Sequence, residues 1–240
     1  MFELFSDIFA VRDNPLTRLD ARAKLVIALF AIIAVIMSRH AAFGFGVCVL
    51  VLAATGMIGI PVKIAGERIA MPFGMALVVV VIKVFLSGME EGLASGLLLA
   101  SHVLGAASIA MLLGFVTPAH QLFRGLRWFG LSAAWVDLAL LTYRYVFVLI
   151  ETAVDMASAQ RVRMGYTGFG RSLSSFSVLA GGVVIRSTEQ AARTHEAMLA
   201  KGWSGGDTHQ PLPPVRLRDV LAAAAVCLLI SAAYIGWGAK

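Results

Sequence analysis

Residues 131–150 read LSAAWVDLALLTYRYVFVLI, an apolar stretch long enough for a helix to cross a bilayer. Whether this stretch crosses decides the topology of everything that follows it. Asp137 and Arg144 lie within it, and Glu151 and Asp155 follow on the same predicted helix. Each of these charges would be costly at bilayer depth. We therefore predict that residues 131–150 do not cross the membrane.

Five other apolar stretches flank this segment and predict transmembrane helices: residues 25–37, 43–60, 69–86, 97–116 and 220–237. Hydrophobic residues make up 59% of the 240 residues, more than the ~45–50% typical of soluble domains. Pro72 is expected in the first turn of the third helix, where its missing N–H is least costly. The acidic N-terminus does not have the pattern of a signal peptide. The composition predicts an all-α integral membrane protein.

Basic residues are distributed unevenly around these stretches. With residues 131–150 outside the bilayer, 17 of the 20 Lys and Arg fall on one side and 2 on the other, and 11 lie between residues 117 and 219. Since basic flanks stay in the cytoplasm, we predict a multi-pass protein of the inner or plasma membrane with a cytoplasmic N-terminus. The expected regions are a cytoplasmic segment at 1–24, transmembrane helices 1–4 within 25–116, a cytoplasmic helical platform at 117–219 and a final transmembrane helix at 220–240.

The platform is itself predicted to be helical, over residues 118–129, 132–165 and 172–201. Gly165, Gly168 and Gly170 are expected to separate the two long helices, and Gly202 to end the second in a left-handed conformation. These helices are too apolar to stand alone in water. They are expected to lie on one another, on the membrane surface or on a partner.

Several kinds of site are not expected. The five histidines lack the i, i+4 spacing of a helical metal pair, and no cysteine or carboxylate completes a ligand set, so no metal or other cofactor is predicted. His102 is instead expected to be a hydrogen-bonded packing residue, and Lys83 to reach the membrane interface. No phosphate-binding loop is present, and the scattered cations do not form a nucleic-acid-binding cluster.

The two long platform helices end in similar sequences. The first ends with residues 157–168 (ASAQRVRMGYTG) and the second with residues 196–205 (EAMLAKGWSG). Each has small residues, a cation, a glycine, an aromatic residue and a further glycine. A cation in the last turn is ordinary C-capping chemistry, because it complements the helix dipole. The repetition favours a second interpretation, in which both ends dock on a partner that offers carboxylates or carbonyls.

On these residues the chain resembles the transmembrane T component of energy-coupling-factor transporters, in the cobalt/nickel-type (CbiQ/NikQ-like) branch. The resemblance covers nearly the whole chain and is carried by four segments: residues 19–25 (LDARAKL), 141–145 (LTYRY), 186–191 (RSTEQA) and 197–205 (AMLAKGWSG). It implies a coupling subunit that catalyses no reaction. The implied partners are two cytoplasmic ABC ATPase subunits and a membrane substrate-binding subunit for Co²⁺ or Ni²⁺.

The resemblance also implies which residues contact the ATPases, within a coupling-helix region at 117–219. They are those of the two helix ends: Arg161, Arg163, Gly165, Ala200, Lys201 and Gly202. Two departures from the family pattern matter. Lys201 stands where the family usually has Arg, which keeps the charge but loses bidentate bonding. Met164 stands between Arg163 and Gly165, so either Arg161 or Arg163 could be the first coupling cation.

Charged residues on the long helices suggest structural ion pairs. Arg144 with Glu151 or Asp137, and Arg186 with Glu189, are spaced so that they can interact along one helix face.

Two other functions compete with coupling. Gly202-Trp203-Ser204-Gly205 matches the Gly-x-Ser-Gly of rhomboid proteases, which would make the chain an intramembrane serine hydrolase. The polar, proline-rich residues that follow argue against it, since a rhomboid serine opens a membrane helix. The third possibility is a passive membrane scaffold, for which the charge of Lys201 would not matter.

Overall fold

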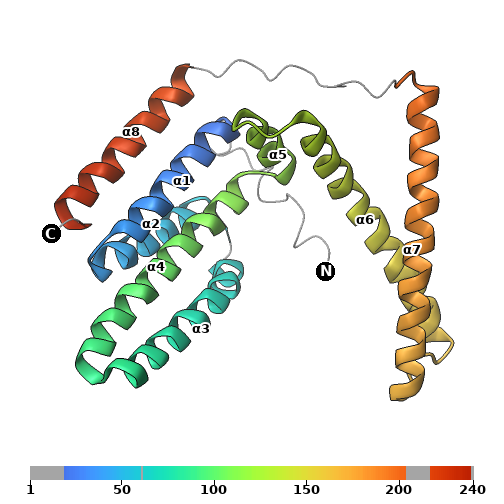
Figure 1. The fold of residues 1–240 in the computed structure, drawn as a ribbon, viewed down its shortest axis with the longest axis horizontal. Coiled ribbons are helices and arrows are strands. Elements are labelled where there is room, and N and C mark those ends of the chain that lie inside the picture. Colours follow the sequence, from blue (N-terminus) through green and yellow to red (C-terminus); the bar gives the residue numbers. More distant parts are fainter. Residues whose placement is uncertain (1–18, 61, 204–216, 239–240) are drawn as a thin grey trace. The chain divides into compact units, whose positions relative to one another are not determined.

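A computed structural model describes residues 19–60, 62–203 and 217–238, which form α-helices and one π-helix and contain no strand (Figure 1). In chain order the elements are α1 (Ala21–Met37), α2 (Ala41–Met57), α3 (Val62–Ser87), α4 (Met89–Val116), α5 (Ala119–Trp128), α6 (Ala133–Val162), α7 (Phe169–Ala200), α8 (Leu217–Ala233) and the π-helix η2 (Tyr234–Gly238). The predicted all-α membrane fold is confirmed, because helices long and apolar enough to cross a bilayer make up much of the described chain.

The roles expected of Pro72 and Gly170 at helix boundaries are wrong. Pro72 does not open the third helix but lies well inside α3, which already begins at Val62. A proline there removes one backbone donor, and membrane helices tolerate this where neighbouring groups satisfy the freed carbonyl. Gly170 does not separate the platform helices either, because α7 begins at Phe169, directly after Gly168 with its φ of 93°. Glycine is permitted in a helix at a modest cost.

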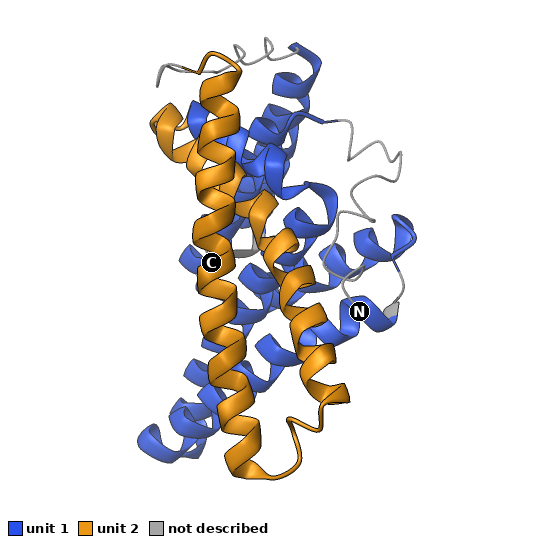
Figure 2. Cartoon of the chain, turned by 90° about the vertical axis from the view of Figure 1, so that its right-hand side faces the viewer, with its two compact units in different colours: residues 1–128, 213–240 blue, residues 129–212 orange. Residues whose placement is uncertain are grey.

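The described elements fall into two compact units, coloured separately in Figure 2. Unit 1 contains α1–α5, α8 and η2, and unit 2 contains α6 and α7. The predicted platform helix at 118–129 is present as α5, but it packs against α1 and belongs to unit 1.

Unit 1 is organised around α4, which packs against α1, α2 and α3. Glycines permit the close approach of these helices. A Cβ at Gly44 of α2 would lie 2.6 Å from the Ser101 carbonyl oxygen of α4, and one at Gly92 of α4 would lie 2.5 Å from the Lys83 carbonyl oxygen of α3. Small residues at helix contacts are how apolar helices gain packing inside a bilayer.

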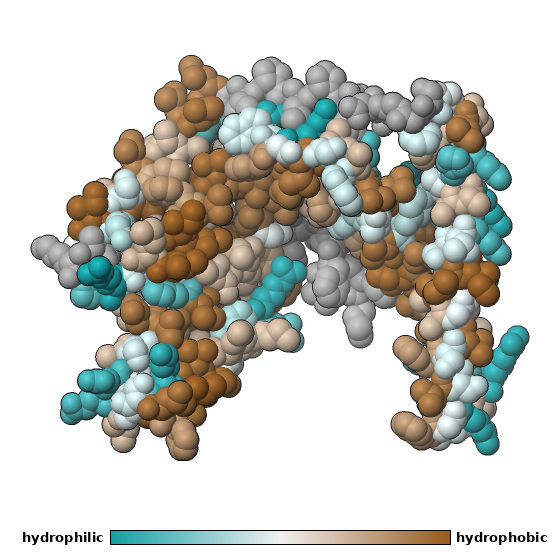
Figure 3. All heavy atoms as spheres, in the orientation of Figure 1, coloured by the Kyte–Doolittle hydropathy of each residue, from teal (hydrophilic) through white to brown (hydrophobic). Residues whose placement is uncertain are grey.

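Four described helices have the length and composition of a membrane crossing: Lys63–Ser87, Met89–Val116, Ala133–Val162 and Leu217–Gly236. The shorter α2 is also apolar. Because α6 is among the four, the predicted five-helix topology with residues 131–150 outside the bilayer stays a prediction. Figure 3 shows mainly hydrophobic side chains over unit 1, whereas hydrophobic and hydrophilic side chains alternate along α7.

Candidate functional site

The C-terminus of α6 is closed by a two-bond turn of the Schellman type. The Met164 N–H donates to the Arg161 carbonyl (3.0 Å) and the Gly165 N–H donates to the Gln160 carbonyl (2.9 Å). Arg163 caps the helix with φ −81° and ψ 13°, and Met164 then adopts a left-handed φ of 59°. The reversal therefore occurs at Met164, a residue type that favours this conformation much less than glycine does.

The C-terminus of α7 is closed in the same way. The Gly202 N–H donates to the Leu199 carbonyl (2.9 Å) and the Trp203 N–H donates to the Met198 carbonyl (3.0 Å). Lys201 caps the helix with φ −86° and ψ 7°, and Gly202 has a φ of 82°. The expectation that Gly202 ends this helix in a left-handed conformation is confirmed.

The matching hydrogen bonds align the two ends residue by residue. Arg163 corresponds to Lys201, Met164 to Gly202 and Gly165 to Trp203. Arg161 corresponds to Leu199, two residues before the capping position. The left-handed residue directly after the cation is thus Met164 in one end and Gly202 in the other. Matching the letters of the two ends pairs Gly165 with Gly202. The hydrogen bonds and φ values instead pair Met164 with Gly202, so the equivalence of Arg163 and Lys201 is visible only in the structure.

Gly165 shapes the first end by close packing. A Cβ at Gly165 would lie 2.6 Å from Ser175 Oγ of α7 and 2.9 Å from the Gln160 carbonyl oxygen. The Ser175 hydroxyl donates to the Gly165 carbonyl (2.8 Å), and the Gln160 side-chain amide donates to the Ser175 carbonyl (3.0 Å). These bonds tie the turn to the first part of α7.

The cations of both ends are exposed, and so are Arg161 and Ala200. Each cation lies at the negative end of a helix dipole, with which its charge interacts favourably. Apolar side chains around the first end are exposed too: Val162 is 83%, Met164 63% and Phe169 86% accessible. At the second end Trp203 packs edge-on against His195, with 6.1 Å between ring centroids. Both ends can therefore present a cation, and the first adds an apolar surface.

Of the residues in the predicted ion pairs, Arg186 and Glu189 lie on the side of α7 that faces α6. Arg186 and Glu189 line a polar groove of about 510 Å³ together with Arg193 and Thr152. The Arg144 guanidinium lies 5.9 Å from the centre of the Tyr145 ring. The pairs Arg186–Glu189 and Arg144–Glu151 stay predictions. Between the two helices, the hydroxyls of Tyr145 and Thr194 form a hydrogen bond of 2.7 Å.

His102 is a packing residue, as expected. Its Nε2 lies 3.1 Å from the Ser38 carbonyl oxygen and 3.4 Å from Ser38 Oγ. Among the residues that the structure describes, no group of three or more His, Cys, Asp or Glu is placed to hold a metal ion. Ser204 and Gly205 of the rival serine motif lie outside the described residues.

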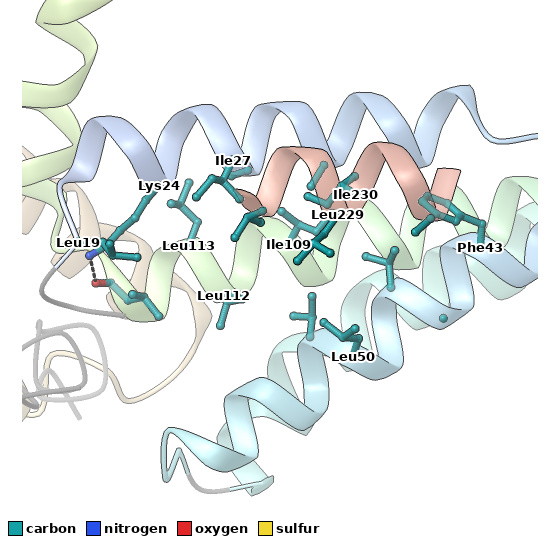
Figure 4. Close-up of a pocket in the computed structure, with 18 of the residues that line it drawn as sticks. Leu19, Lys24, Ile27, Phe43, Leu50, Ile109, Leu112, Leu113, Leu229 and Ile230 are labelled. Carbon is teal, nitrogen blue, oxygen red and sulfur yellow. Dashed lines mark hydrogen bonds between the residues drawn. The ribbon is translucent and has the colours of Figure 1, made fainter. Parts of the chain in front are cut away.

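The sequence analysis missed a buried charge cluster at the start of α1. Lys24 is 7% exposed and donates to the Val116 carbonyl (3.3 Å), as the dashed line in Figure 4 shows. Arg22 and Asp219, the latter from α8, are buried as well. Burial lowers the pKa of Lys24 to about 8, although Asp20 and Asp219 act in the opposite direction. The signal available was a pair of cations in the first turn of an apolar helix, directly before the predicted span.

Comparison with known proteins gives consistent matches. Residues 12–212 match the family model of the cobalt transport protein CbiQ. The chain is 38% identical over 93 residues to the cobalt transport protein CbiQ of Rhodobacter capsulatus, covering 39% of this chain and 38% of that one. It is 30% identical over 162 residues to an uncharacterized protein of Methanocaldococcus jannaschii, covering 61% and 60%.

A putative fused cobalt transport protein CbiMQ of Methanocorpusculum labreanum matches over 108 residues at 33% identity, covering 45% of this chain and 18% of the relative. The alignments therefore span less than two thirds of each of these relatives.

Proposed function

Because the chain belongs to the CbiQ family of cobalt transport proteins, we propose that it is the coupling subunit of an ATP-driven importer of Co²⁺ or Ni²⁺. In this role it transmits the motion of two cytoplasmic ATPases to a membrane subunit that binds the ion. The observation that carries the proposal is the pair of equivalent helix ends, each with an exposed cation directly before a left-handed residue.

Arg163 and Lys201 are the cations that we assign to the two ATPases. Each cation extends from a hydrogen-bonded turn that satisfies some of the last helix carbonyls. Its side chain is exposed and can enter a groove on a partner. A groove that offers carboxylates would pair with either cation, and only Arg163 could bind one in a bidentate manner. When the ATPases close, the ends that they hold would move with them.

The connection between the two ends supports force transmission. Gly182 of α7 receives the Met156 side chain of α6, so that a Cβ there would overlap the Met156 methyl group. Together with the Tyr145–Thr194 bond, this contact lets α6 and α7 move as one body.

Exposed apolar side chains on α6 and α7 support the presence of further partners. Val136 is the one buried residue of α6, and α7 has none among its described residues. Exposed apolar residues on the two helices include Leu138, Val154, Phe176 and Ile185. Such surface is normally covered by lipid or protein. We assign it to the membrane surface and to the ion-binding subunit, with both helix ends in the cytoplasm.

The fused relative supports an assembly of this kind. Its name joins CbiM and CbiQ in one chain, which places a second cobalt transport component beside a member of this family. We infer that a CbiM-like protein is the ion-binding partner here.

The double variant Arg163→Glu/Lys201→Glu tests the proposal. We expect it to insert and fold normally but to lose the ATPases in a mild-detergent pull-down, and to lose ion uptake. Arg171→Glu, another exposed cation of unit 2, is the matched charge control and should keep both. Retained ATPase binding and uptake in the double variant would refute the assignment and favour a passive scaffold. A cysteine at position 201 that reacts only from the periplasmic side would refute the topology.

A further inference from the structure

An apolar groove of about 610 Å³ runs through unit 1 between α1, α2, α4 and α8 (Figure 4). Each of the four helices lines it with apolar side chains, for example Ile27 of α1, Val47 of α2, Leu112 of α4 and Leu229 of α8. Two contacts attach α8 along one side of the groove. At one end Asp219 lies close enough to Lys24 to oppose the lowering of the pKa of its amine by burial. At the other end the Tyr234 hydroxyl donates to the Met37 carbonyl (3.2 Å).

The lining does not suit water. Every lining side chain except that of Lys24 is apolar, so ordered water would find few partners along the groove. An empty volume of this size is also unfavourable, because the surrounding atoms lose their packing contacts. In a bilayer the available apolar filler is lipid hydrocarbon.

Lys24 marks the polar end of the groove, as Figure 4 shows. Arg218 is exposed at the start of α8, next to Asp219. Asp20 and Asp219 partly offset these charges. Because Arg218 is exposed, its charge is available at this end to pair with an anionic headgroup.

We propose that the groove holds one acyl chain of an anionic phospholipid, with its headgroup at Lys24 and Arg218. Met37 lies thirteen positions after Lys24 in α1, which corresponds to roughly 20 Å at 1.5 Å per residue. One leaflet of a bilayer has about 15 Å of hydrocarbon, so the groove accommodates a chain that stays within its own leaflet. The bound lipid fills the space between α8 and the rest of unit 1. The site does not depend on the proposed coupling function.

The test uses the full-length chain, with any partners that co-purify, reconstituted in equal parts phosphatidylglycerol and phosphatidylcholine. Lipids that remain bound after transfer to detergent are counted and identified by native mass spectrometry. Gly46 lines the groove, and a Cβ there meets no atom within 4 Å, so Gly46→Leu fills the groove without a clash at Cβ. Gly74→Leu on α3 is the matched control, with equally open surroundings and no part in the groove.

We expect one retained phospholipid on the native chain, enriched several-fold in phosphatidylglycerol. Gly46→Leu should reduce retention about tenfold, and Gly74→Leu should leave it unchanged. Lys24→Gln keeps a donor for the Val116 carbonyl and should retain the lipid but lose the preference for phosphatidylglycerol. Equal retention by the native chain and Gly46→Leu would overturn the site. An unchanged preference in Lys24→Gln would overturn the assignment of the headgroup.

Discussion

Met164 and Gly202 hold the same place in two helix ends, each directly after a capping cation and each with a positive φ, 59° and 82°. Glycine adopts this conformation without strain, and methionine does not. The chain thus keeps a strained residue at the first end. Because the side chain of Met164 is largely exposed, burial within the described chain does not explain it. Contact of the Met164 side chain with an ATPase would account for the strained conformation.

Met164→Gly should stabilise the isolated chain by up to about 1 kcal/mol, because it removes the left-handed strain and little packing. Gly202→Ala should destabilise it by about 1 kcal/mol for the opposite reason, since a Cβ there meets no atom within 4 Å and the cost is conformational. Thermal unfolding in detergent measures both effects.

Gly170→Ala provides the control for these two substitutions. Gly170 is helical and also has open space at its Cβ position, so alanine should be neutral or stabilising there. If Met164→Gly lowers the melting temperature while Gly170→Ala does not, the strain at Met164 is not significant. If Met164→Gly also weakens ATPase binding, the exposed methionine belongs to the docking surface.

The single variants Arg163→Glu and Arg161→Glu should differ sharply in ATPase co-purification. Arg163 corresponds to Lys201 in the hydrogen-bond pattern, whereas Arg161 corresponds to Leu199. We expect Arg163→Glu to reduce the recovered ATPase at least tenfold and Arg161→Glu to reduce it less than threefold. A reversed order would mean that sequence spacing, and not the backbone, identifies the coupling cation.

Much of the fold follows from apolar stretches and glycines. The ends of α1, α4, α6 and α7 were predicted to within a few residues, since Ser38, Pro118 and Gly202 are local stop signals. The early starts of α3 and α4 were not predicted, because residues 62–68 and 89–96 precede the apolar stretches that marked these helices. Tertiary contact decides there: Gly92 and Gly96 bring α4 against α3 before the apolar stretch begins.

The sequence was enough to locate the two helix ends of the candidate site, but not to show which residues of the two ends correspond. Exposed cations near helix ends are visible in the letters, and so is the repetition of the two ends. That methionine takes the left-handed position at the first end depends on φ, which the sequence pattern does not reveal there. The burial of Lys24 was equally hidden, since Asp219 lies far from it in the chain and α4 supplies the carbonyl that it binds.

Gly44→Ala should destabilise unit 1 by about 1–3 kcal/mol. The new methyl group would lie 2.6 Å from the Ser101 carbonyl oxygen and 2.9 Å from Ser101 Oγ, so α2 and α4 would have to separate. Gly46→Ala, two residues along the same helix, meets no atom within 4 Å and should stabilise by about 0.5–1 kcal/mol. The two melting temperatures should therefore move in opposite directions, and a common direction would contradict the close packing of α2 on α4.

Lys24 should make the stability of the chain rise with pH. Its pKa in the folded chain is about 8, against 10.5 for the solvated amine. Between these values the unfolded chain holds a proton that the folded chain has released, so the free energy of unfolding increases by at most about 1.4 kcal/mol per pH unit. Below pH 8 both states are protonated and the folded chain carries the full desolvation cost.

Lys24→Met should abolish this slope between pH 8 and 10.5. Comparing its melting temperature with that of the native chain at pH 7.5 and 9.5, in detergent without anionic lipid, cancels the other titrating groups and excludes an effect of a bound headgroup. Lys63→Met, at an exposed position, should run parallel to the native chain. If Lys24→Met runs parallel too, the ammonium of Lys24 is solvated in the folded protein and the buried cluster is not formed.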